Sequence, residues 1–134
     1  ANPGSPDLGK ELDRMEEKIE AGASFFQTQA TYEPDVFQKF MYKASNLNVP
    51  ILSGQIVLKS GKMARYLNTN LPGVNVPDTI IEKLDNADDL SQTSIGITAQ
   101  LIREIRPMCN GIHIMAIGWE SRVPKILEAS ELTT

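Results

Sequence analysis

The sequence predicts an α/β fold in which parallel strands are each followed by a helix. Three observations support this fold class. Short, apolar, strand-like runs alternate four times with segments whose apolar residues recur at helical spacing. The 134 residues suffice for one core, and no low-complexity segment or internal boundary divides them. Alternation of this kind favours right-handed βα units on a parallel sheet, so we expect one domain spanning 1–134.

The first two units lie in the amino-terminal part of the chain. A helix is predicted from the cap pair Ser5-Pro6, through apolar residues at helical spacing, to Gly22 just past its end. An aromatic-rich run at 24–29 is short enough for a strand. Glu33-Pro34 then opens a second helix, whose apolar face continues to Ala44.

The next two elements predict a third unit, and a weaker strand follows them. An apolar run at 49–57 predicts a strand, and 60–68 predicts a helix with Met63 and Leu67 facing inward. In the segment 71–77, proline and glycine leave room only for a very short or irregular strand.

The carboxyl-terminal part completes the alternation. Asp78 is expected to cap a helix over 79–84, and 91–108 predicts a longer helix. The final strand is expected at 112–117 and the final helix at 123–129.

Four βα units are about half of a closed eight-stranded barrel, which typically needs about 250 residues. A half-barrel has two exposed parallel edges that need a partner. Three explanations stay open: the other half lies in further sequence, two chains pair, or the protein is a small open α/β sheet.

Composition excludes several classes of protein. The net charge is −4 and no basic run occurs, which argues against nucleic-acid binding. No apolar stretch approaches the roughly 20 residues that span a membrane, and no secretory signal is visible. One cysteine and one histidine cannot form a disulfide or a metal cluster, so we expect a cytoplasmic protein without a metal.

Polar side chains on an apolar strand are the main candidates for chemistry. Gln27 and Gln29 share one face of the first predicted strand, and Gln29 sits at its carboxyl end, where βα-barrel sites form. An amide there suits a flat heterocycle with an amide-like edge, although it can equally satisfy neighbouring backbone. Glu11 and Lys18 are two helical turns apart and can equally form an ordinary solvated face.

The segment from Lys18 to Gln29 resembles the motif K-x-x-A-G-A-x-x-x-x-T-Q of the methylenetetrahydrofolate reductase family without a gap. Weaker similarities follow in order at 50–54, at Gly96 and at 111–113, so the resemblance covers nearly the whole chain. The resemblance implies that these residues form the C-terminal half of a TIM (βα)8 barrel.

This resemblance implies a flavoprotein oxidoreductase of one-carbon metabolism and methionine biosynthesis, acting on CH-NH donors. The family reduces 5,10-methylenetetrahydrofolate to 5-methyltetrahydrofolate by hydride transfer through FAD, from NAD(P)H or another electron donor. Folate or a methanopterin-type C1 carrier is the expected substrate. The family's acidic catalytic residue would lie upstream of Ala1, so no catalytic residue is assigned within this chain.

The resemblance also assigns binding residues. Asn2, Glu11 and Lys18 are expected to contact FAD, and Lys18 would compensate phosphate charge. Gln29 is expected to hydrogen-bond the pterin. Met63 and Leu67 stand where relatives place a glutamine and a phenylalanine against the substrate, and Asn2 stands where many carry a tyrosine.

An alternative function belongs to a different class. The chain would then be a non-catalytic half-barrel interaction module that binds a partner chain or a pterin. In either case we expect it to pair with the missing barrel half or to form an oligomer.

Overall fold

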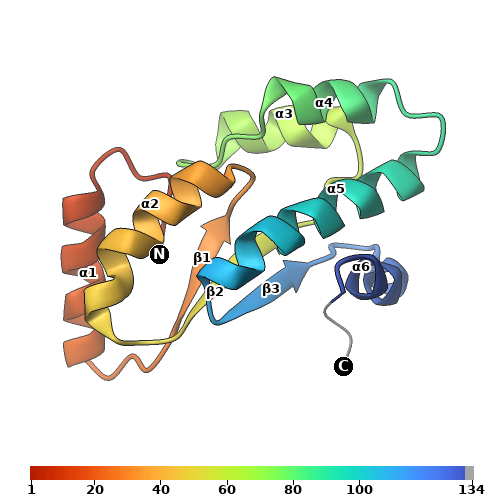
Figure 1. Cartoon of the computed structure of the whole chain (residues 1–134). Coiled ribbons are helices and arrows are strands. Elements are labelled where there is room, and N and C mark those ends of the chain that lie inside the picture. Colours follow the sequence, from red (N-terminus) through yellow and green to blue (C-terminus); the bar gives the residue numbers. More distant parts are fainter. Residues whose placement is uncertain (132–134) are drawn as a thin grey trace.

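Three parallel strands form the centre of the computed structural model, which describes residues 1–131 (Figure 1). The strands are β1 (Phe26–Ala30), β2 (Ile51–Ile56) and β3 (Gly111–Met115), in the spatial order β1-β2-β3. Both pairs are parallel, so the predicted α/β fold with parallel βα units is confirmed. This is the arrangement expected of part of a TIM-type barrel.

Six α-helices surround this sheet in the described residues. They are α1 (Leu8–Glu20), α2 (Pro34–Ala44), α3 (Gly61–Asn70), α4 (Asp78–Asp85), α5 (Leu90–Ile105) and α6 (Val123–Ala129). Helices α2 and α5 lie on the same face of the sheet, while α3 and α4 lie together beyond the carboxyl ends of the strands (Figure 1). None of the helices in residues 1–131 has the length and hydropathy needed to cross a membrane.

The core between the sheet and α2 is built mainly from aromatic and branched side chains. Phe37 and Phe40 of α2 are fully buried against Phe26 and Ile51, which project from neighbouring strands. Ile105 of α5 joins this cluster and is also fully buried. Because such side chains contribute about 1.5–3 kcal/mol each on burial, this cluster holds the two helices on the sheet.

The segment predicted as a very short or irregular strand at 71–77 is irregular, and the chain passes directly to α4. Val74 and Val76 are nevertheless buried among residues of α3 and α4. Strand β2 therefore pairs directly with β3, with Ser53 opposite Ile112. No strand forms at 71–77, as the proline and glycine predicted, and the side chain of Asn68 pairs with both backbone polar groups of Val76.

Two helix starts differ from the sequence prediction. The cap of α1 is Asp7 and not Ser5: the Asp7 carboxylate accepts from the Lys10 backbone N–H at 3.1 Å. A carboxylate is favoured there because the first turn of a helix has unpaired N–H groups and a partial positive charge. The residue before α4 is Pro77, so Asp78 is the first helical residue and not the cap.

Two element ends also differ. Helix α5 ends at Ile105 and not at 108, and a 3-10 turn covers Arg106–Met108, because Pro107 has no N–H to continue the α-helical hydrogen bonds. Strand β3 ends at Met115 and not at 117, since Ile117 has a φ of 44° and leaves the extended conformation.

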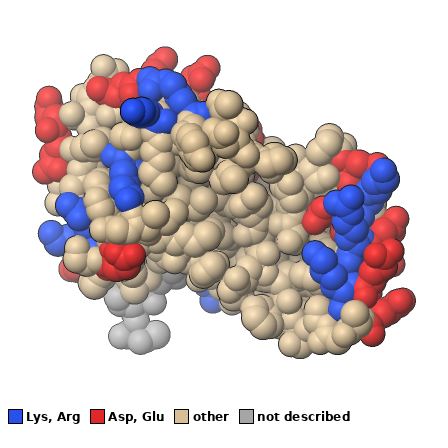
Figure 2. Space-filling view, turned by 180° about the vertical axis from the view of Figure 1, so that it is seen from behind, with Lys and Arg blue, Asp and Glu red and all other residues tan. Residues whose placement is uncertain are grey.

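The face of the sheet opposite α2 and α5 has a different character. Seen from behind, the middle of the molecule is a broad surface without charged side chains, and Lys, Arg, Asp and Glu gather at its sides (Figure 2).

Candidate functional site

A hollow of about 470 Å³ opens beside β1 and β3 and contains three of the six predicted binding residues, Asn2, Glu11 and Gln29. We call it the strand-end hollow. Its lining comprises Ala1, Asn2, Glu11, Arg14, Gln27, Thr28, Gln29, His113 and Met115. The site therefore combines the amino-terminal segment, helix α1 and two strands, and its volume lies within the range of small-molecule sites.

Strand β1 contains a bulge beside this hollow, and both candidate glutamines line the hollow. Gln27 pairs with Leu52 and Ala30 pairs with Gly54. Between these two pairs, β1 therefore has one more residue than β2. Thr28 is buried between the two glutamines, and its hydroxyl accepts from the Gly54 N–H at 3.0 Å. Bulges commonly re-aim side chains beside functional sites.

Gln29 is held in place by hydrogen bonds to the backbone of Ala1 and Ala30. Its N–H donates to the Ala1 carbonyl at 2.8 Å, and its side-chain Oε1 accepts from the Ala30 N–H at 3.2 Å. The Oε1 atom is thus occupied, and no hydrogen bond within residues 1–131 uses the side-chain Nε2. Gln29 therefore presents a hydrogen-bond donor to the strand-end hollow.

Glu11 is the buried acid of the site. It lies in the first turn of α1 with 7% of its surface exposed, and its Oε1 accepts from the Asn2 N–H at 2.9 Å. A carboxylate accepts several hydrogen bonds, so Glu11 can also receive a hydroxyl from a ligand in the hollow.

Asn2 lines the hollow, but its side-chain amide is already hydrogen-bonded to backbone groups. Its Nδ2 donates to the Pro72 carbonyl at 3.1 Å, and its Oδ1 accepts from the Gly4 N–H at 3.2 Å. Both ends of the amide are occupied by backbone. Asn2 therefore ties the amino-terminal segment to the segment that follows α3.

Lys18 lies near the hollow but does not line it. It is exposed in the last turn of α1, two turns beyond Glu11. Partial burial lowers the pKa of the Ala1 amino group, and the positive charge of Lys18 lowers that pKa further. The charge of Lys18 therefore acts on the terminal amino group, and Ala1 is one of the residues that line the hollow.

Met63 and Leu67 lie elsewhere, on α3. Leu67 is buried in the cluster with Ile56 and Val76, and the sulfur of half-buried Met63 accepts from the Lys59 N–H at 3.5 Å. The structure does not bring these two side chains to the strand-end hollow, and their contact with a substrate stays a prediction.

Two residues of the hollow were missed by the sequence reasoning as ligand contacts. Arg14 follows Glu11 by three positions, so the two share a helix face, a spacing that could have identified it. His113 is half-buried in β3 and lines the hollow. Within residues 1–131, no group of three His, Cys, Asp or Glu side chains is placed to hold a metal.

The parallel sheet and its helices define this chain as part of a βα-barrel-type protein. Comparison with known families identifies which one. The family model of methylenetetrahydrofolate reductase matches residues 1–131, and the chain therefore belongs to the methylenetetrahydrofolate reductase family. The family resemblance of the Lys18–Gln29 motif is thereby confirmed.

Two fission-yeast proteins illustrate the similarity. Methylenetetrahydrofolate reductase 2 of Schizosaccharomyces pombe is 30% identical over 145 aligned residues, which cover 97% of this chain and 22% of that protein. Methylenetetrahydrofolate reductase 1 of the same organism is 22% identical over 131 residues, covering 91% of this chain and 21% of that protein. The chain thus spans about a fifth of the length of these relatives.

Proposed function

We propose that this chain forms the C-terminal half of the catalytic barrel of a flavin-dependent methylenetetrahydrofolate reductase. The whole protein would be an oxidoreductase that reduces 5,10-methylenetetrahydrofolate to 5-methyltetrahydrofolate. NAD(P)H or another donor would supply the electrons, and the cytoplasm is the proposed location. Family membership supports the reaction class, and the strand-end hollow supports the position of the site.

The residues of the hollow fit part of a flavin nucleotide. Buried Glu11 can accept hydrogen bonds from ribityl hydroxyls, while Arg14 and nearby Lys18 offer positive charge for phosphate groups. FAD, when bound, would supply the hydride-transfer chemistry. Asn2 would act by fixing the segment that carries the Glu11 contact, because its own amide is already bonded to backbone.

Gln29 is the proposed pterin-binding residue. Its Nε2 is oriented because Oε1 is held by the Ala30 N–H. It can therefore donate a hydrogen bond to a carbonyl or ring nitrogen on the pterin edge without first reorganising. Orienting the substrate in this way would raise the rate of hydride transfer by positioning the reacting groups. This role requires no proton transfer by residues of this chain.

One observation carries this proposal: Glu11 and Gln29, 18 positions apart in the numbering, line the same hollow although they come from a helix and a strand. The test is to purify the full-length protein and reduce its bound flavin anaerobically. Addition of methylenetetrahydrofolate should then restore the oxidised flavin absorbance.

A protein that folds and binds no flavin would contradict the proposal. If it also bound a pterin or a partner chain, the alternative of a non-catalytic interaction module would be supported instead. A reduced flavin that is reoxidised by a methanopterin-type carrier and not by the folate would retain the reaction class and change the substrate.

A further inference from the structure

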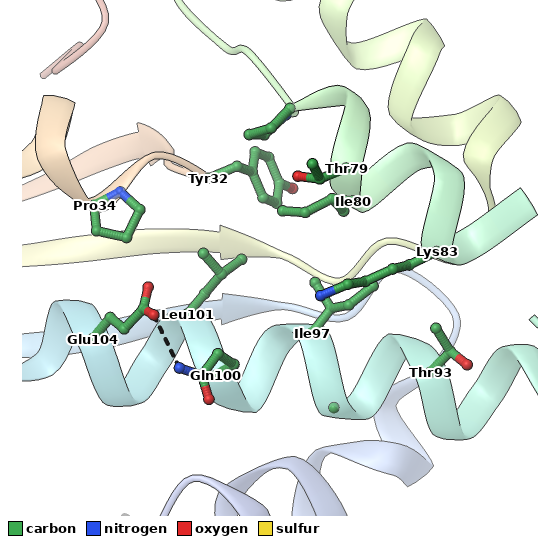
Figure 3. A pocket seen from close by; sticks show the side chains of 12 residues that line it. Tyr32, Pro34, Thr79, Ile80, Lys83, Thr93, Ile97, Gln100, Leu101 and Glu104 are labelled. Atoms are coloured by element: carbon green, nitrogen blue, oxygen red, sulfur yellow. Dashed lines mark hydrogen bonds between the residues drawn. The ribbon is translucent and has the colours of Figure 1, made fainter.

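A second cavity of about 570 Å³ lies between α4, α5 and the segment after β1 (Figure 3). We call it the α4–α5 cavity. It shares no lining residue with the strand-end hollow. Its volume is in the range of small-molecule sites, so it can hold a ligand of its own.

The wall of this cavity is largely apolar. Ile80 of α4 and Ile97 and Leu101 of α5 face one another across it, and the ring of Tyr32 closes one end (Figure 3). The Tyr32 hydroxyl donates to the Ile56 carbonyl at 2.7 Å, which leaves only the aromatic ring for the cavity. Such a wall favours a flat apolar group.

Gly96 opens the wall further. It lies inside α5, where glycine is less favourable than alanine, and a Cβ added at this position would meet no atom within 4 Å. Packing inside the chain therefore does not require a glycine here. Its missing side chain lets a ligand approach the helix backbone closely.

The charge at the rim is asymmetric. The Lys83 side chain extends from α4 toward Ile97 on α5 (Figure 3), and no ion pair to Lys83 forms within residues 1–131. Glu104 lines the cavity from further along α5 and accepts from the Gln100 Nε2 at 2.9 Å. Lys83 is thus the cation available to a ligand, while Glu104 already has a partner.

We propose that the α4–α5 cavity is a second ligand site, which binds an amphipathic anion. The flat apolar body of this ligand would lie over Ile97 and Leu101, with its carboxylate or sulfonate at Lys83. The anion is assigned by charge complementarity and the body by the apolar wall. This site is independent of the flavin and folate proposal, because the two cavities share no residues.

The probe for this site is 8-anilinonaphthalene-1-sulfonate, titrated by fluorescence into the full-length protein. Lys83→Met keeps the apolar stem and removes the charge, and it should weaken binding at one saturable site at least tenfold. Gly96→Leu should fill the cavity and abolish that site. Lys62→Met on α3 and Gln92→Leu on α5 change exposed residues outside the cavity and should leave the dissociation constant within twofold.

Circular dichroism of each variant checks folding, and Lys83→Met at an exposed position keeps the test valid if Gly96→Leu misfolds. Equal dissociation constants in wild type and Lys83→Met would overturn the assignment of an anion. Saturable binding that persists unchanged in folded Gly96→Leu would overturn the site itself.

Discussion

The side chain of Asn68 binds both backbone polar groups of Val76. Its Oδ1 accepts from the Val76 N–H at 2.6 Å, and its Nδ2 donates to the Val76 carbonyl at 3.1 Å. Val76 is 1% exposed, so water cannot replace these bonds readily. One amide side chain thus satisfies the backbone N–H and carbonyl of Val76, as a neighbouring strand would in a β-sheet.

Asn68→Ala should therefore loosen the segment 71–77. Leaving the buried N–H and carbonyl unpaired costs about 1–3 kcal/mol for each unsatisfied group. Hydrogen–deuterium exchange followed by mass spectrometry should show faster exchange at Val76. Asn70→Ala on the same helix is the matched control, since Asn70 bonds only the exposed carbonyl of Tyr66. Unchanged protection at Val76 in Asn68→Ala would show that the segment is held by apolar packing alone.

Tyr32 predicts a loss of stability at alkaline pH. Burial raises the pKa of its hydroxyl well above the usual value, and the hydrogen bond to Ile56 offsets only part of that effect. The unfolded chain releases this proton near pH 10 while the folded chain keeps it, so stability falls as pH rises through about 10.

The variant Tyr32→Phe separates the hydrogen bond from the titration. At pH 7 it should cost about 1–2 kcal/mol, because the buried Ile56 carbonyl loses its donor. Above pH 10 only the wild type carries the alkaline penalty, and the difference between the two Tm values should shrink. A constant difference in Tm from pH 7 to 10.5 would refute the role assigned to Tyr32.

Gln55 of the middle strand β2 is fully buried, and the two ends of its side-chain amide have different partners. The Nε2 donates to the Thr31 carbonyl at 3.0 Å and to the Thr31 hydroxyl at 3.1 Å, while the Oε1 has no partner within residues 1–131. Gln55→Met keeps the volume and removes the donor, which should cost about 1–3 kcal/mol.

Gln55→Glu should behave differently with pH. A buried carboxylate facing the Thr31 carbonyl is strongly unfavourable, so burial should raise the pKa of the new side chain. The protonated form can donate to Thr31 and is stabilising at low pH. Stability should therefore be highest in acid and decrease as pH rises through that raised pKa. Thermal unfolding at pH 5 and pH 8 measures this, and a loss of stability equal to that of Gln55→Met at both pH values would contradict it.

Much of the fold could be predicted from local patterns. The apolar runs around Phe26, Ile51 and Ile112 gave the three strands, because buried parallel strands carry near-continuous apolar residues. The irregular segment at 71–77 was predicted from its proline and glycine, but the contact from Asn68 to a residue eight positions away has no local pattern that could predict it. The start of α1 was misplaced because Ser5 and Asp7 are both good caps, and only the structure shows which carboxylate or hydroxyl reaches an N–H of the first turn.

The candidate site was predictable only in part. Gln29 and Glu11 were identified from the family motif and position, and the structure brings both to one hollow. Arg14 was not identified, although its spacing from Glu11 places the two on one helix face, and His113 was not identified because a strand histidine carries no distinctive pattern. Leu67 is buried in a core cluster, a placement that follows from how α3 packs beyond the strand ends.

Lys18→Ala and Gln29→Ala in the full-length enzyme should separate flavin binding from folate binding. Lys18→Ala should raise the dissociation constant of FAD and leave the pterin pocket intact, because Lys18 is an exposed cation of α1 that does not line the hollow. Gln38→Ala on α2 is an exposed glutamine outside the hollow and should change neither property.

The rate of methylenetetrahydrofolate-dependent flavin reoxidation in Gln29→Ala tests the central claim most directly. Losing the oriented Nε2 donor should weaken the folate half-reaction by about 1–3 kcal/mol, because the buried pterin edge is left without its partner. The dissociation constant of FAD, titrated by its absorbance, should remain that of the wild type. A folded, flavin-loaded Gln29→Ala enzyme that reoxidises at the wild-type rate would contradict the assignment of Gln29 and the placement of the pterin in the strand-end hollow.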